Sequence, residues 1–408
     1  MTPGPMAGVR VVELASPFTA FAGKLLADAG ADVIVVEPPG GALQRTHGPF
    51  ADDQPGAERS LAWWAENTSK RGIVIDLDDT DGRDLYRRLA ATADIVLEAE
   101  AGNRLAELGL DHPDLVADCP DLIHLAVNPF GRSGPRVGER ITDLTLLAGG
   151  GPMWSCGYDD HSLPPVRGCG EQGLRMSAHF AVMSVLTALL ARPVHGGQFI
   201  DLSMHAAANV TTEFASYGWM AGQQTVQRQT GRHATPTPSE WTQVQCADGR
   251  WLNTGVPPRT GREFAALRDW LVELDLVEDF PLFSLLELSD QYELLTLQLI
   301  EEDPLAGELF GAGREALHLI ASRVSAHDAF IGFQDRGIAV GVIWSPDEVM
   351  SDPHFVARGF PTEVEHEQID RSVLYAGAPI RFTESPMGVR SRAPTLDEHG
   401  AQIRAELG

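Results

Sequence analysis

Short apolar runs alternate with longer amphipathic segments through the first half of the chain. Apolar runs between turn residues are typical of buried strands, and apolar residues every three or four positions are typical of helices. The helical segment 18–29 ends at Gly30, and Asp79 or Thr80 can cap a helix over 80–91. Strands separated by such helices predict βαβ units and a parallel sheet. The expected strands are residues 9–14, 32–36, 73–77, 94–97, 122–127 and 198–203.

The pattern changes further along the chain. Residues 171–192 predict a long helix that is apolar on nearly all sides and therefore buried. Residues 223–238 are polar and show no clear period, unlike the strands and helices predicted before residue 222. Residues 240–335 then combine a hairpin signal at 245–251 with several amphipathic helices rich in Leu and Glu. The tail is expected to return to strands at 338–343 and 380–382.

The balance of charge limits the partners of the protein. The sequence has 408 residues and contains 31 Lys and Arg against 57 Asp and Glu, a formal net charge of −26. So strong a negative charge repels nucleic acid and anionic membrane surfaces, and we expect neither as a partner. The apolar stretch 180–191 is also too short to cross a bilayer. An anionic ligand would need a local cluster of basic residues.

Cysteine and histidine positions predict no metal and no disulfide framework. The four cysteines are far apart, without a Cys-x-x-Cys pair. The histidines at 112, 124, 161, 179, 195 and 205 do not show the spacing of metal ligands on one face. The first residues have no basic segment followed by an apolar one, so we expect no signal peptide and a cytoplasmic protein with reduced thiols.

Several motifs, taken in order, resemble the class III CoA-transferase family, which includes formyl-CoA transferase and α-methylacyl-CoA racemase. The segment Val33-Ile-Val-Val-Glu-Pro-Pro-Gly-Gly41 opens the resemblance, and Ser69-Lys-Arg71 continues it. Phe130-Gly-Arg-Ser-Gly-Pro135 and Ile200-Asp-Leu-Ser203 follow. Asp352-Pro-His354 comes near the end, so the resemblance covers essentially the whole chain.

This resemblance implies a particular α/β architecture. The family has a Rossmann-like large domain formed by both ends of the chain, with a smaller α+β domain inserted between them. Here the large domain would comprise residues 1–222 and 336–408, and the linker and small domain residues 223–335. The family also forms interlinked homodimers, which we expect for this chain. The first βα unit has no G-x-G-x-x-G turn, so a dinucleotide site of the usual kind is not expected.

The resemblance also implies a candidate catalytic residue. Family transferases use an Asp nucleophile at the start of the long buried helix, and counting from Pro164-Pro165 places Glu171 at this position. A carboxylate at a helix N-terminus is kept ionised by the helix dipole. The alternative is that Glu171 is only a first-turn acidic residue, a common feature of helix starts. Cys169 has no neighbouring histidine in sequence to activate it, and an inert thiol is the simpler interpretation.

Family residues for the racemase reaction and for CoA binding are partly replaced. Racemases of the family carry a His before the Asp that corresponds to Asp143, and this chain has Thr142, which makes racemisation improbable. The basic positions that remain for the CoA phosphates are Lys70, Arg71 and Arg140, which could equally be ordinary surface residues. Acidic Glu100 and Glu107 occupy the same part of the expected CoA pocket.

Three functions stay open at this point. The first is a CoA-transferase that uses Glu171, with an acyl-CoA and a carboxylic acid as substrates and no tightly bound cofactor. The second is a non-catalytic subunit that acts with a related second chain. The third is the same fold recruited to a lyase or dehydratase reaction without normal CoA binding. The sequence names neither the acyl donor nor the acceptor.

Overall fold

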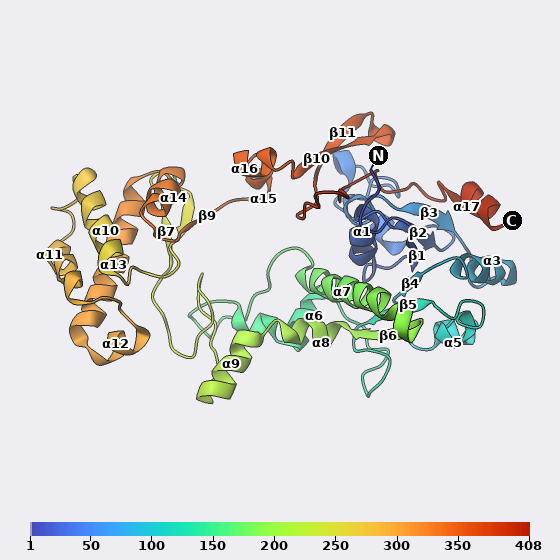
Figure 1. Ribbon diagram of the computed structural model, residues 1–408, viewed down its shortest axis with the longest axis horizontal. Coiled ribbons are helices and arrows are strands. Elements are labelled where there is room, and N and C mark those ends of the chain that lie inside the picture. Colours follow the sequence, from blue (N-terminus) through green and yellow to red (C-terminus); the bar gives the residue numbers. More distant parts are fainter. Residues whose placement is uncertain (1) are drawn as a thin grey trace. The chain divides into compact units, whose positions relative to one another are not determined.

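The computed structural model describes residues 2–408 and divides the chain into two compact units (Figure 1). The larger unit comprises residues 1–154, 166–217 and 350–408, and the smaller unit residues 155–165 and 218–349. The C-terminal segment therefore returns to the unit that contains the N-terminus.

A six-stranded parallel sheet forms the centre of the larger unit. Its strand order is β3-β2-β1-β4-β5-β6, so the order reverses between β1 and β4. Each expected strand of the first half is present. The third is shifted towards the N-terminus from the predicted 73–77, because its ladder with β2 runs from Arg71 to Val74. The bounds are β1 (Arg10–Leu14), β2 (Asp32–Glu37), β3 (Arg71–Val74), β4 (Ile95–Glu98), β5 (Ile123–Asn128) and β6 (Gln198–Ser203).

Both faces of this sheet are covered, as expected for parallel strands that are apolar on both sides. On one face, alternate strand residues such as Val11 and Ile95 share a core with α1 (Ala20–Asp28) and α7 (Gln172–His195). On the other face, strand residues such as Val12 share a core with Tyr86 and Leu89 of the helix over 80–90 and with Ile403 of the helix over 400–407. The remaining helices of this unit are α2 (Leu61–Glu66), α3 (Thr80–Ala90), α4 (Arg104–Glu107), α5 (His112–Leu115), α6 (Asp143–Gly150), α8 (Met204–Val210), α16 (Pro353–Ala357) and α17 (Gly400–Leu407), and α9 (Glu213–Gly222) crosses the unit boundary.

Among the helices that the structure describes, α7 alone is long and apolar enough to cross a membrane by length and composition. It contacts α1, α6, α8, β5 and β6, and its small residues Ala178, Ala181 and Ala188 are buried. One face of the helix is nevertheless exposed, with Leu190 at 84% and Val194 at 79% accessibility. The prediction of a helix buried on nearly all sides therefore holds for only one face within this chain.

The smaller unit has its own core. A three-stranded antiparallel sheet joins β7 (Gln243–Gln245), β8 (Trp251–Asn253) and β9 (Gly341–Ile343), which confirms the hairpin expected at 245–251. Because β9 pairs with β8, residues 336–349 lie in this unit. Its helices are α10 (Gly261–Glu273), α11 (Phe283–Leu286), α12 (Leu297–Glu302), α13 (Pro304–Arg323), α14 (Ala326–Asp335) and α15 (Pro346–Val349).

The C-terminal strands differ from the expectation. Residues 380–382 are not in a strand. A hairpin of β10 (Pro361–His366) and β11 (Arg371–Ala376) precedes them instead. Asp370 occupies the left-handed region at its turn, with a φ of 51°. The hairpin packs Val364 and Tyr375 with Trp63 and Trp64 in a small core of the larger unit.

Candidate functional site

A cavity of 380 Å³ lies at the carboxyl ends of β1, β4 and β5. Open parallel sheets bind ligands at this edge, beside the point where the strand order reverses, because the flanking loops separate there. Three of these loops line the cavity, and residues 137–141 complete it. The lining residues are Phe18, Ala99, Ala101, Gly102, Asn128, Pro129, Phe130, Gly131, Arg132, Val137, Gly138, Glu139, Arg140 and Ile141.

One of the two arginines of this cavity is already paired. The Arg132 guanidinium binds Asp111 at 2.8 Å and also the buried Glu98 at the end of β4. Burial raises the pKa of Glu98 to about 7, although Arg132 and the Glu100 N–H act in the opposite direction. Arg132 therefore serves mainly as the counter-ion of two carboxylates below the cavity.

Arg140, the other arginine, is exposed at the cavity wall. Within residues 2–408 its side chain has no hydrogen-bond or ion-pair partner. It is the residue of this cavity whose donors are free for an anion, as Arg side chains commonly are at phosphate sites.

Lys70 and Arg71 are placed differently from Arg140. Lys70 is fully buried, and its ammonium lies 2.8 Å from Glu13 and donates to Asn67 and to the Ala20 carbonyl. Burial lowers the pKa of Lys70 and raises that of Glu13. With three protein acceptors around it and no exposed surface, this ammonium has no donor directed to solvent.

Arg71 begins β3 and forms ion pairs within the larger unit. Its guanidinium binds Asp32 at 2.7 Å and Glu406 of α17 at 2.7 Å. The structure therefore does not gather the three predicted basic residues into one cluster. Glu100 lines a separate cavity of 140 Å³ beyond β1 and β2, where it pairs with Arg104 at 3.2 Å.

Glu171 is the N-cap residue of α7 and is exposed. Its side chain accepts no capping hydrogen bond. Asp143 occupies the helix N-terminus instead, because its Oδ1 accepts from the N–H groups of Gly173 at 2.8 Å and Leu174 at 3.3 Å. Arg167 binds the other oxygen of Asp143 at 2.8 Å. The Glu171 carboxylate is consequently free of hydrogen bonds and ion pairs within the described chain.

Residues 141–143 connect the cavity to the start of α7. Ile141 lines the cavity, Thr142 caps α6, and Asp143 binds the first turn of α7. Thr142 has a structural role here, since its hydroxyl accepts from the Thr145 N–H in a capping box. The position expected to hold a racemase His is therefore used to begin a helix.

A second acidic residue near Glu171 was not anticipated from the sequence. Glu66, at the end of α2, is buried and binds Arg175 of α7 at 2.5 Å. Burial raises the pKa of Glu66, Arg175 lowers it, and the charge of Glu171 raises it further. Glu66 lies in a short helix with no motif around it, so only the fold reveals that it faces α7.

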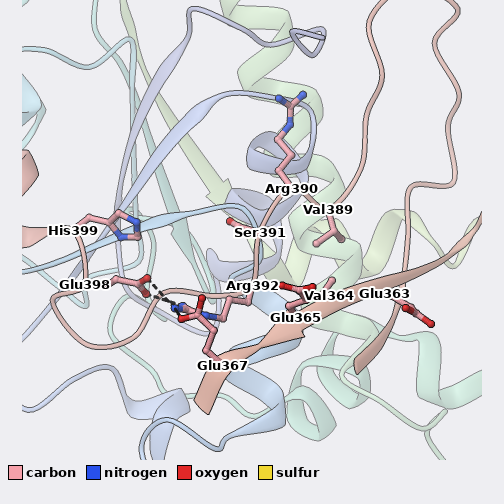
Figure 2. A pocket seen from close by; sticks show the side chains of 10 residues that line it. All are labelled: Glu363, Val364, Glu365, Glu367, Val389, Arg390, Ser391, Arg392, Glu398 and His399. Atoms are coloured by element: carbon pink, nitrogen blue, oxygen red, sulfur yellow. Dashed lines mark hydrogen bonds and ion pairs between the residues drawn. The ribbon is translucent and has the colours of Figure 1, made fainter. Parts of the chain in front are cut away.

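Figure 2 shows a different cavity, of 410 Å³, formed by the β10 strand and the segment that follows β11. Four of its lining residues are glutamates, and Arg392 pairs with Glu398 at 2.7 Å (Figure 2). None of the residues predicted from the sequence lines it. Of its two arginines, Arg392 pairs with Glu398 and Arg390 donates to the Pro386 carbonyl. Because four carboxylates also line this cavity, the sheet-edge cavity is the better candidate for an anionic ligand.

Metal ligands and disulfides do not contribute to either cavity in the described part of the chain. Residues 2–408 contain no group of three His, Cys, Asp or Glu side chains placed to hold a metal ion. The four cysteines are free thiols, and Cys169, two residues before Glu171, is exposed. The groups at the start of α7 are therefore carboxylates, arginines and backbone N–H groups.

Comparison with known proteins identifies the family. The model of CoA-transferase family III matches residues 6–400. The chain belongs to CoA-transferase family III. The resemblance noted in the motifs is thereby confirmed, and members of the family act on CoA thioesters without a tightly bound cofactor.

Individual family members resemble the chain over its whole length. Succinyl-CoA:(R)-benzylsuccinate CoA-transferase subunit BbsE of Thauera aromatica is 30% identical, over 98% of this chain and 93% of the relative. Succinate–glutarate CoA-transferase of Agrobacterium fabrum is 28% identical, over 99% and 96%. The crystal structure of a CAIB/BAIF family protein from Brucella suis has a TM-score of 0.79, with 25% identity and 100% coverage of both chains. The α/β fold of this CoA-transferase family is thus present throughout the chain.

Proposed function

We propose that the protein transfers CoA between an acyl-CoA and a carboxylic acid, with Glu171 as the nucleophile. The observation that carries the proposal is the exposed Glu171 carboxylate at the N-cap of α7, which has no hydrogen-bond or ion-pair partner within the described residues. Asp143 and Arg167 organise the first turn behind it. Family membership supplies the reaction class, and the free carboxylate supplies the group that the reaction needs.

The proposed chemistry proceeds through two exchanges at the Glu171 carboxyl. A carboxylate oxygen attacks the thioester carbon, the C–S bond breaks, and CoA leaves as a thiolate with a mixed anhydride on the enzyme. The thiolate then attacks the glutamyl carbonyl, releasing the donor acid and forming an enzyme–CoA thioester. The acceptor carboxylate repeats these steps in reverse, which yields the new acyl-CoA and restores Glu171. Each tetrahedral oxyanion requires hydrogen-bond donors, for which the glycine-rich loop 168–170 provides backbone N–H groups.

Arg140 is the proposed contact for the anionic part of CoA. It is the cavity arginine with free donors, and residues 141–143 lead from it to α7. Lys70 and Arg71 support the same site indirectly, by fixing the start of β3 to β1, β2 and α17. The net charge of −26 makes this single free arginine important, since little else on the cavity wall attracts a phosphate.

We further propose that the protein works in the cytoplasm as an interlinked dimer. The exposed apolar face of α7 borders a groove of 510 Å³ that α1 and residues 379–387 complete. The groove is lined mainly by aliphatic and aromatic side chains, among them Met183, Leu190 and Phe382. A second chain covering this surface would remove it from water.

A second candidate function is that of a subunit which needs a related chain for activity. It is favoured by the fact that two relatives are named as subunits, the T. aromatica protein and an alpha subunit of succinyl-CoA–L-malate CoA-transferase from Chloroflexus aurantiacus, which is 25% identical. At the site, Asp143 already binds the helix N–H groups that could otherwise serve an oxyanion.

Activity of the purified chain tests the two candidates against each other. The wild type should exchange CoA between a panel of acyl-CoAs and carboxylic acids without another protein, and E171A should lose at least about a thousandfold in turnover. E171D, which keeps a carboxylate on a shorter side chain, should retain part of the activity. D118A, at an exposed Asp in another loop of the same unit, is the control and should leave turnover unchanged. Full activity of E171A would reject the nucleophile, and activity only with a second chain would favour the subunit.

A further inference from the structure

Arg175 is held in place by a buried carboxylate and a half-buried aromatic ring. Its Nη2 lies 2.5 Å from Glu66 Oε1, and its guanidinium lies over the ring of Phe21 at 4.3 Å. Glu66 is fixed in turn, because its Oε2 accepts a hydrogen bond of 2.7 Å from Gln44 Nε2. A flexible cation is thus anchored by three side chains from three other segments of the larger unit.

The anchored guanidinium keeps unused donors. The Arg175 side chain is 33% exposed, and its Nε and Nη1 atoms have no partner within residues 2–408. The Arg175 N–H donates to the Glu171 carbonyl at 3.0 Å, so the side chain lies one helical turn after the proposed nucleophile. An arginine that is already oriented loses little conformational entropy when it binds a carboxylate.

The position of Glu66 argues against a purely structural pair. Its side chain is only 6% exposed, and burying a carboxylate costs free energy that a half-exposed partner repays only in part. The surrounding positions of α2 are filled by Trp63 and Trp64, so an apolar residue would suit the site. A buried carboxylate is useful here because it fixes the guanidinium of a residue that lies one helical turn after Glu171.

We propose that Arg175 binds the free carboxylate of a dicarboxylic acid, or of the corresponding acyl-CoA, and that Glu66 is the positioning residue for Arg175. The inference deepens the proposed function, on which it rests for the presence of an acyl group beside Glu171. Arg175 would select substrates with a second carboxylate and would leave the reacting carboxyl group to Glu171.

Two thioesters of equal chain length test this selectivity. Glutaryl-CoA and pentanoyl-CoA differ only at the end remote from CoA, so the ratio of their dissociation constants isolates the contribution of the terminal carboxylate. Calorimetric titration of E171Q, whose amide cannot attack the thioester, should give a preference for glutaryl-CoA of about 10- to 100-fold, as expected for a hydrogen-bonded charge pair. The Arg175 and Arg88 variants are compared with it in the same E171Q background. R175Q should reduce the ratio to about one, with an unchanged dissociation constant for pentanoyl-CoA. R88Q, which removes an exposed arginine from α3, should keep the E171Q ratio.

Additional variants separate binding from folding. R175Q removes the ion-pair partner of the buried Glu66, which keeps only its hydrogen bond from Gln44. The double variant E66Q/R175Q, which is uncharged at both positions, should therefore be folded and show the same loss of selectivity. E66L should reduce the glutaryl-CoA preference several-fold, whereas E66Q, whose amide oxygen can still accept from Arg175, should largely restore it. A merely structural pair would change the unfolding free energy of these variants and leave the ratio constant.

The free acids keep this test independent of CoA binding. Glutarate should give a stronger saturation-transfer NMR signal than pentanoate with the wild type, and equal signals with R175Q. If neither thioester binds, the proposed function fails and the acids alone decide the inference. Equal binding of glutarate and pentanoate by the wild type, or an undiminished preference in R175Q, would overturn it.

Discussion

Two groups of cations in the larger unit serve different purposes. Lys70 and Arg71, at the start of β3, are surrounded by carboxylates of the protein itself. Arg140 and Arg175 lie at the cavity wall and at the start of α7, and each keeps donors without a partner in residues 2–408. In a chain with a net charge of −26, pairing of basic residues with acids of the protein itself leaves few cations for a ligand. The presence of basic residues at positions that match the family therefore says less about ligand binding than whether their donors are free.

Removal of Lys70 should have the largest effect on stability. K70M leaves the buried Glu13 carboxylate without its counter-ion, which costs about 3–5 kcal/mol of unfolding free energy. Urea unfolding of the purified variant measures the loss. The double variant E13Q/K70M removes both charges and should recover most of it. A stable K70M that had lost CoA binding would instead place Lys70 at the ligand and contradict the comparison.

Glu98 should make stability depend on pH. Its pKa is raised by burial from 4.5 to about 7, so the folded protein binds a proton more tightly than the unfolded chain does. Relative to E98Q, the wild type should therefore lose stability as pH rises from about 4.5 to about 7, by about 3 kcal/mol at most. Unfolding curves of both proteins at pH 5 and pH 8 check the difference. A constant difference between them would show that the carboxyl is not perturbed.

The Arg140 side chain should matter for CoA and not for folding. R140Q should weaken CoA binding by about 10- to 100-fold because a charge-assisted contact is lost. Its unfolding free energy should stay within about 0.5 kcal/mol of the wild type, since the side chain is exposed. Titration calorimetry with CoA provides the measurement, with R88Q as the control. Unchanged affinity in R140Q would remove Arg140 from the proposed site.

Arg71 should show the smallest effect. R71Q breaks partly exposed pairs with Asp32 and Glu406, worth about 1 kcal/mol together. CoA affinity should not change, because this guanidinium is occupied within the protein. A loss of CoA affinity as large as that of R140Q would show that Arg71 changes partners when the ligand binds.

Most strands of the parallel sheet could be predicted from the sequence because each is a short apolar run between turn residues. Residues 9–14 and 198–203 have the pattern of buried strands, and they form β1 and β6 with nearly the predicted bounds. The hairpin of β10 and β11 was missed because β10 begins at a Pro and places its one Val between two glutamates, which weakens the strand signal. The interlinked dimer, the domain boundaries at 222 and 335, and the roles of the site residues stay predictions.

The partners of the site residues could not be found from the sequence alone. Glu66 and Arg175 belong to helices that only the fold brings together. Arg71 meets a carboxylate 335 residues further along the chain. Burial also decides what a residue can bind. Lysine is a common phosphate ligand, but Lys70 lies in the core and cannot reach a ligand in solvent. Glu171 lies at the N-cap of α7, where the sequence predicted the long helix to begin, and its catalytic role stays a prediction.

Chemical trapping at Glu171 tests the central claim most directly. The protein is incubated with an acyl-CoA that it turns over, hydroxylamine is added, and the digested chain is mapped by mass spectrometry. The account predicts a hydroxamate on the peptide that contains Glu171, dependent on the acyl-CoA and absent in E171Q. A hydroxamate on a different carboxylate of the chain, or turnover without any modified carboxylate, would contradict it.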